Sequence, residues 1–188
     1  MLRRVTTRWR NTAALSYGEV IMRIGILSDT HNQADRTRQA IELLLAHEAE
    51  AIFHCGDFTD AAILQLCALK PCYFVFGNND SDTVPDLRQA SESSSAVCLG
   101  WGGEVTLDGR RIAVTHGHLR SEVRPLLDQH PDFLFTGHSH IPDDHQDGPT
   151  RRINPGALHR AAKYTVAVLD LSRDHLEFLE VRWKRETQ

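Results

Sequence analysis

Aspartate, asparagine and histidine residues form five short clusters along this sequence, and each cluster follows a serine, threonine or glycine. Carboxylate, imidazole and carboxamide groups bind divalent metal ions, and a mixture of the three suits Mn, Fe, Co, Ni or Zn better than Ca or Mg. Each cluster alone is also an ordinary strand end or turn, but five in one chain favour a common metal centre. The clusters contain Asp29 with His31, Asp57, Asn78, His116 with His118, and His138 with His140.

Ligand counting indicates two metal ions rather than one. Two ions with four protein ligands each need eight positions, so one of the seven candidate ligands must be shared. A carboxylate bridges two cations readily, which leaves Asp29 or Asp57 as the bridge. Ions about 3.5–4 Å apart share a water, lower its pKa towards neutrality and hold the oxygens of a phosphoryl group. The seven candidate ligands are Asp29, His31, Asp57, Asn78, His116, His138 and His140.

Short apolar runs precede the five clusters and read as buried strands. Helical patterns at residues 35–47 and 59–69 alternate with the first three of these strands, which predicts βαβ units and a parallel sheet. Because ligands of such sheets gather at the carboxyl ends of the strands, the clusters should meet in one crevice. The predicted strands are the run that ends before Ser28, then residues 51–54, 72–76, 111–115 and 133–135.

The rest of the chain is richer in strands than in helices. Residues 81–95 are polar and predict a surface loop or short helix, whereas residues 121–130 predict a helix. The pair Asp108-Gly109 is typical of a hairpin turn. Residues 96–99 form a predicted edge strand, at which two copies of the chain would associate as a homo-oligomer. Further strands are predicted at residues 96–99, 104–107, 164–171 and 176–183.

Composition favours one globular domain, at residues 22–188, and excludes several kinds of partner. The chain has 188 residues and a formal net charge of -4, so no broad basic surface attracts polymeric nucleic acid. No apolar run approaches the length of about 20 residues that spans a membrane. The four cysteines form no C-x-x-C pair and no secretory segment is evident, which predicts reduced thiols and a cytoplasmic protein.

Residues 1–21 differ in composition from the rest of the chain. Four arginines occur before the first acidic residue, Glu19, as in a basic tail or a transit peptide. We interpret this segment as a disordered or dispensable extension, with Met22 as the alternative start of translation.

In their order, the clusters resemble the calcineurin-like metallophosphoesterase superfamily from Met22 to about Trp183. The resemblance implies a four-layer α-β-β-α sandwich of two mixed sheets flanked by helices. It also implies that Asp29, His31, Asp57 and His140 hold one ion, while Asp57, Asn78, His116 and His138 hold the other. The matching motifs are Asp29-Thr30-His31, Gly56-Asp57, Gly77-Asn78, Thr115-His116 and Gly137-His138-Ser139-His140, and Asn154-Pro155-Gly156 is similar to the small single-domain phosphodiesterases of this superfamily.

Asn79 departs from many members, which have a histidine there that binds phosphate and assists the leaving group. A carboxamide donates hydrogen bonds but has no pKa near 7, so it cannot act as a general acid. The small phosphodiesterases often lack this histidine too. We expect His118 to be the substitute proton donor, the alternative being a structural or solvent-facing histidine, and Asp80 to support the loop or a neighbouring histidine.

The sequence therefore predicts a phosphodiesterase in which a metal-bridging hydroxide attacks the phosphorus of a small phosphodiester. Mn is the expected metal, with Ni, Fe, Co and Zn as alternatives. The competing hypothesis is a catalytically weak scaffold that binds a protein partner, as in a relative from the eukaryotic retromer coat. Loss of metal ligands is expected of a scaffold, whereas all seven positions are filled here.

Overall fold

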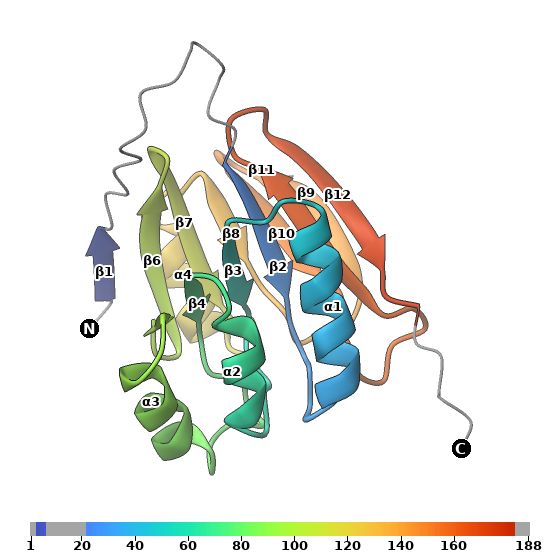
Figure 1. The fold of residues 1–188 in the computed structure, drawn as a ribbon. Coiled ribbons are helices and arrows are strands. Elements are labelled where there is room, and N and C mark those ends of the chain that lie inside the picture. Colours follow the sequence, from blue (N-terminus) through green and yellow to red (C-terminus); the bar gives the residue numbers. More distant parts are fainter. Residues whose placement is uncertain (1–2, 7–21, 183–188) are drawn as a thin grey trace, which may run out of the picture.

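Two β-sheets lie face to face with helices on their outer sides in the computed structural model, which describes residues 3–6 and 22–182 (Figure 1). The first sheet has a parallel centre, because β2 to β5 run in the same direction, and β11 and β12 join it in antiparallel fashion. Its strand order is β12-β11-β2-β3-β4-β5. The strands are β2 (Arg23–Leu27), β3 (Ala51–His54), β4 (Cys72–Phe74), β5 (Ala96–Cys98), β11 (Thr165–Asp170) and β12 (His175–Glu180).

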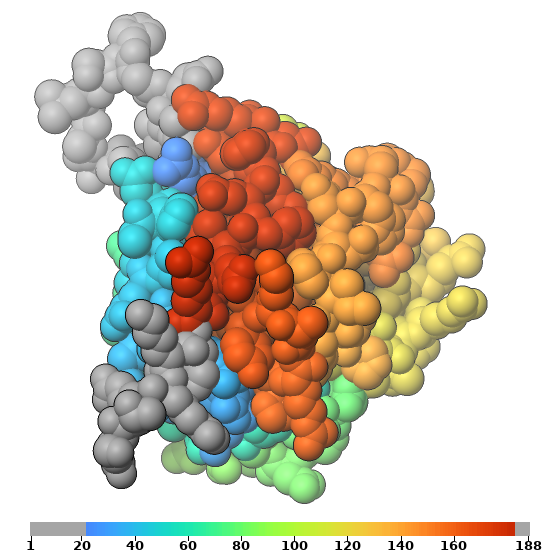
Figure 2. Space-filling view, turned by 90° about the vertical axis from the view of Figure 1, so that its right-hand side faces the viewer, coloured from blue at the N-terminus to red at the C-terminus, as the bar shows by residue number. Residues whose placement is uncertain are grey.

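The second sheet is also mixed, with the order β1-β6-β7-β8-β10-β9. The pairs of β7 with β8 and of β8 with β10 are parallel, whereas β6 with β7 and β9 with β10 are antiparallel. Side on, the strands from β9 to β12 make up much of one face of the molecule, in orange and red (Figure 2). The strands are β1 (Arg3–Thr6), β6 (Gly102–Leu107), β7 (Arg110–Thr115), β8 (Phe133–Phe135), β9 (Pro142–Asp147) and β10 (Thr150–Pro155).

Three buried apolar layers hold the sandwich together. One layer lies between the first sheet and the helices α1 (Ala34–Ala46), α2 (Ala62–Cys67) and α3 (Val84–Glu92). A second lies between the two sheets, where Phe53 meets the edge of Phe135 at 5.3 Å between ring centroids. The third packs α4 (Arg120–Leu127) on the second sheet. The predicted four-layer α-β-β-α fold is confirmed.

Most predicted elements are present, and the differences have local causes. The polar stretch at residues 81–95 contains α3, which begins with Val84-Pro85, and proline is well suited to the first turn of a helix. α2 is shorter than predicted. The hairpin of β9 and β10 was missed because all six residues of β9 are exposed and show no period-2 alternation; backbone pairing with β10 holds the strand in place.

The prediction for residues 1–21 is untested for most of that range, because 1–2 and 7–21 lie outside the described residues. Within it, β1 pairs in parallel with β6, with Arg3 opposite Gly103 and Thr6 opposite Thr106. In the described part of the chain, no helix combines the length and apolar character that a membrane span requires.

Candidate metal centre

The candidate ligands come from both sheets and meet at the carboxyl ends of five strands. β2 leads into Asp29 and His31, β3 into Asp57, and β4 into Asn78. From the second sheet, β7 leads into His116, and β8 into His138 and His140. Two groups of three possible metal-binding residues result, Asp29-His31-His140 and Asp29-Asp57-His116, with ligand atoms within 4.8 Å of one another in each.

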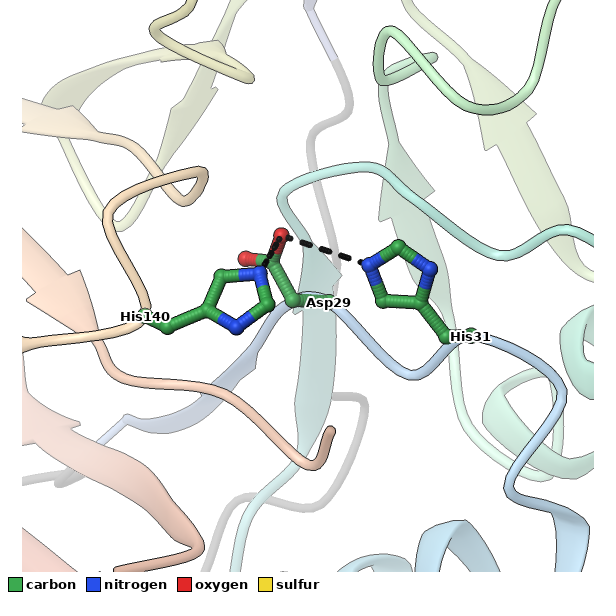
Figure 3. A group of neighbouring side chains, drawn as sticks. All are labelled: Asp29, His31 and His140. Carbon is green, nitrogen blue, oxygen red and sulfur yellow. Dashed lines mark ion pairs between the residues drawn. The ribbon is translucent and has the colours of Figure 1, made fainter. Parts of the chain in front are cut away.

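The first group centres on one oxygen of the fully buried Asp29 carboxylate. Asp29 Oδ1 lies 3.1 Å from Nε2 of His140 and 4.0 Å from Nε2 of His31. Both imidazoles point towards this oxygen from opposite sides (Figure 3). The other carboxylate oxygen, Oδ2, accepts a 3.0 Å hydrogen bond from the backbone N–H of His138, so Oδ1 is the oxygen left for a ligand.

The second group surrounds His116, which is also fully buried. Its Nε2 lies 3.4 Å from Oδ2 of Asp57, 3.9 Å from Oδ1 of Asp29 and 3.1 Å from Oδ1 of Asn78. Its Nδ1 lies 2.8 Å from the carbonyl oxygen of Cys55, to which it donates, so Nε2 is left as the metal-binding nitrogen. The ring of His138 is 5.2 Å from that of His116 between centroids, although neither three-residue group includes His138.

Asp57 lies between the two groups. Its Oδ2 is 3.4 Å from Nε2 of His31 and also 3.4 Å from Nε2 of His116. A carboxylate in this position faces imidazoles from both groups. Asp29 also lies near imidazoles of both groups, since it belongs to both. The structure thus leaves the same two bridging candidates that ligand counting gave.

Buried polar atoms that make no hydrogen bond in the described part of the chain show that the site suits cations. Oδ1 of Asp29 and Nε2 of His31 are buried and have no hydrogen-bond partner among the described residues. Buried polar atoms are normally satisfied, and leaving one unpaired costs about 1–3 kcal/mol. Two neighbouring ligand atoms that make no hydrogen bond, one of them on a carboxylate, therefore fit a divalent cation.

The charges at the site favour ionised carboxylates. Burial alone would raise the pKa of Asp57, but interactions with His116 and Asn79 hold this pKa well below its usual value. Burial lowers the pKa of His31, which favours the neutral imidazole that binds metals. For His116, burial is outweighed by Asp57 and Asp29, so its pKa is raised in the metal-free state.

Asp80 supports the loops that carry Asp57 and Asn78, as the sequence predicted. Its two carboxylate oxygens accept 2.8 Å hydrogen bonds from the backbone N–H groups of Asp57, Thr59 and Gly77. Gly77 must be a glycine, because a Cβ at this position would collide with the side chain and backbone of Asp57. This contact brings the ends of β3 and β4 together.

Asn154 fixes the loop that carries His138 and His140, a role the sequence did not reveal. Its Nδ2 donates to the carbonyl oxygen of Gly137 at 2.7 Å and to Oγ of Ser139 at 3.1 Å. Its Oδ1 accepts from the backbone N–H of Gly156 at 2.9 Å. The Asn154-Pro155-Gly156 motif was recognised by resemblance, but nothing in the sequence pairs it with this loop.

The backbone at the site occupies unusual conformations. Five candidate ligands have positive φ angles, between 41° and 68°, a region that residues other than glycine adopt infrequently. Such conformations cluster at functional sites, where the surrounding structure holds them. The hydrogen bonds made by Asp80 and Asn154 are part of that support. The five residues are Asp29, His31, Asp57, His138 and His140.

Two further histidines line the edges of the site. The ring of His118 lies 5.5 Å from that of His116 and 6.0 Å from that of His138, between centroids. Its Nδ1 is 3.7 Å from a carboxylate oxygen of Glu122, and burial lowers its pKa. His159, outside every spacing pattern in the sequence, has its ring 4.7 Å from that of His31.

Comparison with known proteins agrees with the sequence motifs. A family model described as the calcineurin-like phosphoesterase superfamily domain matches residues 22–174, which confirms the resemblance and the predicted enzyme class. A phosphodiesterase of Methanocaldococcus jannaschii is 26% identical over 157 residues, which cover 81% of this chain and 95% of that protein.

Solved structures share the fold. A structure described as a novel archaeal phosphodiesterase superposes with a TM-score of 0.74 at 25% identity, covering 85% of this chain and 99% of that one. A variant of Vps29 from Entamoeba histolytica gives a TM-score of 0.58 at 16% identity, covering 86% of this chain and 100% of that one. The likeness to Vps29 extends to the fold alone.

Proposed function

This chain belongs to the calcineurin-like phosphoesterase superfamily, and we propose that it is a metal-dependent phosphodiesterase that hydrolyses a small phosphodiester. The convergence of two buried carboxylates with three imidazoles, around ligand atoms that make no hydrogen bond with the described residues, carries the proposal. The preference for diesters is supported by the phosphodiesterase of M. jannaschii and by the archaeal phosphodiesterase structure.

We propose two ions, with Asp57 as the shared ligand. Asp29, His31, Asp57 and His140 would hold one, and Asp57, Asn78, His116 and His138 the other. The equal distances from Asp57 Oδ2 to the imidazoles of His31 and His116 support this assignment. When bound, two such ions lower the pKa of a shared water and neutralise negative charge on phosphoryl oxygens.

The residues around the ions have separate roles in this proposal. Asn79 donates to Asp57 and holds its carboxylate, a role for which a carboxamide needs no pKa near 7. His118 is the proton donor to the leaving oxygen. Its buried Nδ1 has no hydrogen-bond partner among the described residues, and its ring adjoins those of His116 and His138.

A protein-binding scaffold is the second candidate, because the fold is shared with Vps29. The complete set of candidate ligands favours the enzyme. Mn as the native metal, a cytoplasmic location and a homo-oligomer formed at β5, an edge strand of the first sheet, remain predictions from the sequence.

The test is hydrolysis of bis-p-nitrophenyl phosphate compared with p-nitrophenyl phosphate. The protein is stripped of metal and then supplied separately with Mn, Ni, Co, Zn or Mg. We expect a transition metal to restore diester hydrolysis, and Asp57→Asn and His116→Gln to abolish it, while the exposed His175→Gln serves as the control. Stoichiometric binding of two ions with no turnover of either ester would favour the scaffold.

A further inference from the structure

An exposed tryptophan stands at the edge of the metal centre. Trp101 lies directly before β6, and the residue is 39% exposed. Among the described residues, five large apolar side chains are exposed. Two of the others, Leu119 and Ile141, directly follow the site histidines His118 and His140 in the chain. Trp101 therefore offers apolar surface next to His118.

Trp101 is held by backbone contacts to both sheets. Gly100, the residue before it, accepts a 2.8 Å hydrogen bond from the N–H of Phe76, which directly precedes Gly77-Asn78. The carbonyl oxygen of Trp101 accepts a 3.1 Å hydrogen bond from Oγ1 of Thr115, the residue before His116. The position of Trp101 is thus tied to the loops that carry two candidate ligands.

The indole ring contacts two other rings, and part of Trp101 stays exposed. It meets Phe76 edge to face at 5.5 Å between centroids, and lies 6.4 Å from the ring of His118. His118 in turn lies 6.0 Å from His138. One imidazole ring thus separates the indole from the candidate ligands, so a group stacked on Trp101 would belong to the molecule that reacts at the centre.

We propose that Trp101 selects phosphodiesters that carry an aromatic ester group, such as a nucleoside, by stacking on that group. Aromatic rings stack on tryptophan with a preference that aliphatic chains do not match. The acidic net charge of the chain favours a small nucleotide ester over a polymer. The inference rests on the proposed function, and it predicts that the protein prefers nucleotide esters to glycerophosphodiesters.

The test uses two diesters, thymidine 5′-(p-nitrophenyl phosphate), which has aromatic ester groups, and glycerophosphoethanolamine, which has none. Trp101→Ala should lower the ratio of their kcat/KM values about tenfold or more, mainly through KM for the thymidine ester. Trp101→Phe should recover most of the ratio. The control is Leu69→Ala, which removes an exposed apolar side chain two residues beyond the end of α2.

Equal losses on both diesters would mean that Trp101 only supports the loops, and would overturn the proposal. Calorimetric titration with thymidine 5′-phosphate and with glycerol 3-phosphate gives a readout that needs no turnover. If the wild-type protein hydrolyses no diester, the proposed function fails, whereas a weaker binding of thymidine 5′-phosphate in Trp101→Ala would still support stacking. Unchanged binding in that variant would refute it and favour a protein partner for the exposed surface of Trp101.

Discussion

The side-chain amide of Asn79 donates a 2.7 Å hydrogen bond to Oδ2 of Asp57, and its backbone N–H donates a 2.9 Å hydrogen bond to Oδ1 of the same carboxylate. One residue therefore contacts both oxygens of the proposed bridging ligand. This arrangement gives a structural reason for an asparagine at the position where many superfamily members have a histidine. Here the side chain orients the carboxylate of Asp57, the proposed bridging ligand.

Removing this contact should weaken metal binding. In Asn79→Ala the Asp57 carboxylate loses a side-chain donor, and the loss of such a supporting partner typically costs 10–100-fold in metal affinity. We therefore expect the dissociation constant for Mn to rise by about that factor, as measured by calorimetric titration. Ser81→Ala, an exposed change two residues away, is the control. Unchanged affinity in Asn79→Ala would contradict the orienting role.

Asp80→Asn should disturb both stability and the centre. The carboxylate of Asp80 accepts three backbone N–H groups, and an asparagine would turn an amide N–H₂ towards at least one of them. A buried donor left unpaired costs about 1–3 kcal/mol, which urea unfolding of the metal-free protein would detect. The matched control is Asp82→Asn, because Asp82 is exposed in the same loop. Equal midpoints for the two variants would argue against this support.

Metal ions should stabilise the fold as well as activate the site. An ion present at about 100 times its dissociation constant adds about 2.7 kcal/mol, which corresponds to a rise in Tm of about 5–10 °C for a chain of this size. Thermal unfolding with EDTA and with excess Mn would measure this difference. Asp29→Asn should lose most of it, because Asp29 belongs to both ligand groups. An EDTA-insensitive wild-type Tm would contradict a metal centre.

His54 should make the metal-free protein less stable in mild acid. Burial between Thr30 and Phe58 lowers its pKa to about 3, compared with about 6.5 in the unfolded chain. Between these values the unfolded state binds the extra proton. The contribution of His54 is therefore complete above pH 6.5 and is lost as the pH falls towards 3, by about 1.4 kcal/mol per unit.

Urea unfolding at pH 7, 6 and 5 in EDTA would measure this loss. The unfolding free energy of His54→Gln should depend less steeply on pH than that of the wild type. The exposed His175→Gln should keep the wild-type slope. Equal slopes for His54→Gln and the wild type would assign the acid sensitivity to other groups.

Local patterns predicted the parallel strands and the candidate ligands, whereas the four-layer sandwich of two sheets was implied by the resemblance to the superfamily. Apolar runs marked the strands, and each cluster followed one of them. Because ligands of open sheets bind at the carboxyl ends of the strands, the clusters were predicted to lie in one site. Local patterns could not predict contacts between residues that are far apart in the sequence. Asn154, which holds the loop of His138, and Trp101, beside His118, have no distinguishing spacing.

The missed hairpin of β9 and β10 has a different cause. β9 is polar and fully exposed, so it lacks the alternation that identifies a half-buried strand. The strand is held by backbone pairing with β10. Ion pairs between the two strands add to this, such as the one between Arg151 and Asp144 at 2.7 Å. Tertiary context overrode local propensity there.

The two sheets contribute different candidate ligands, and this division affects how the strands that carry them unfold locally. Asp29 and the His138 backbone, 109 positions apart in sequence, are joined by a hydrogen bond across the sheets. An ion held by residues of both sheets would break its coordination whenever either sheet moved away. Local unfolding of β2 and of β8 would then become one cooperative event, and amide hydrogen exchange in the two strands would slow together as the centre fills.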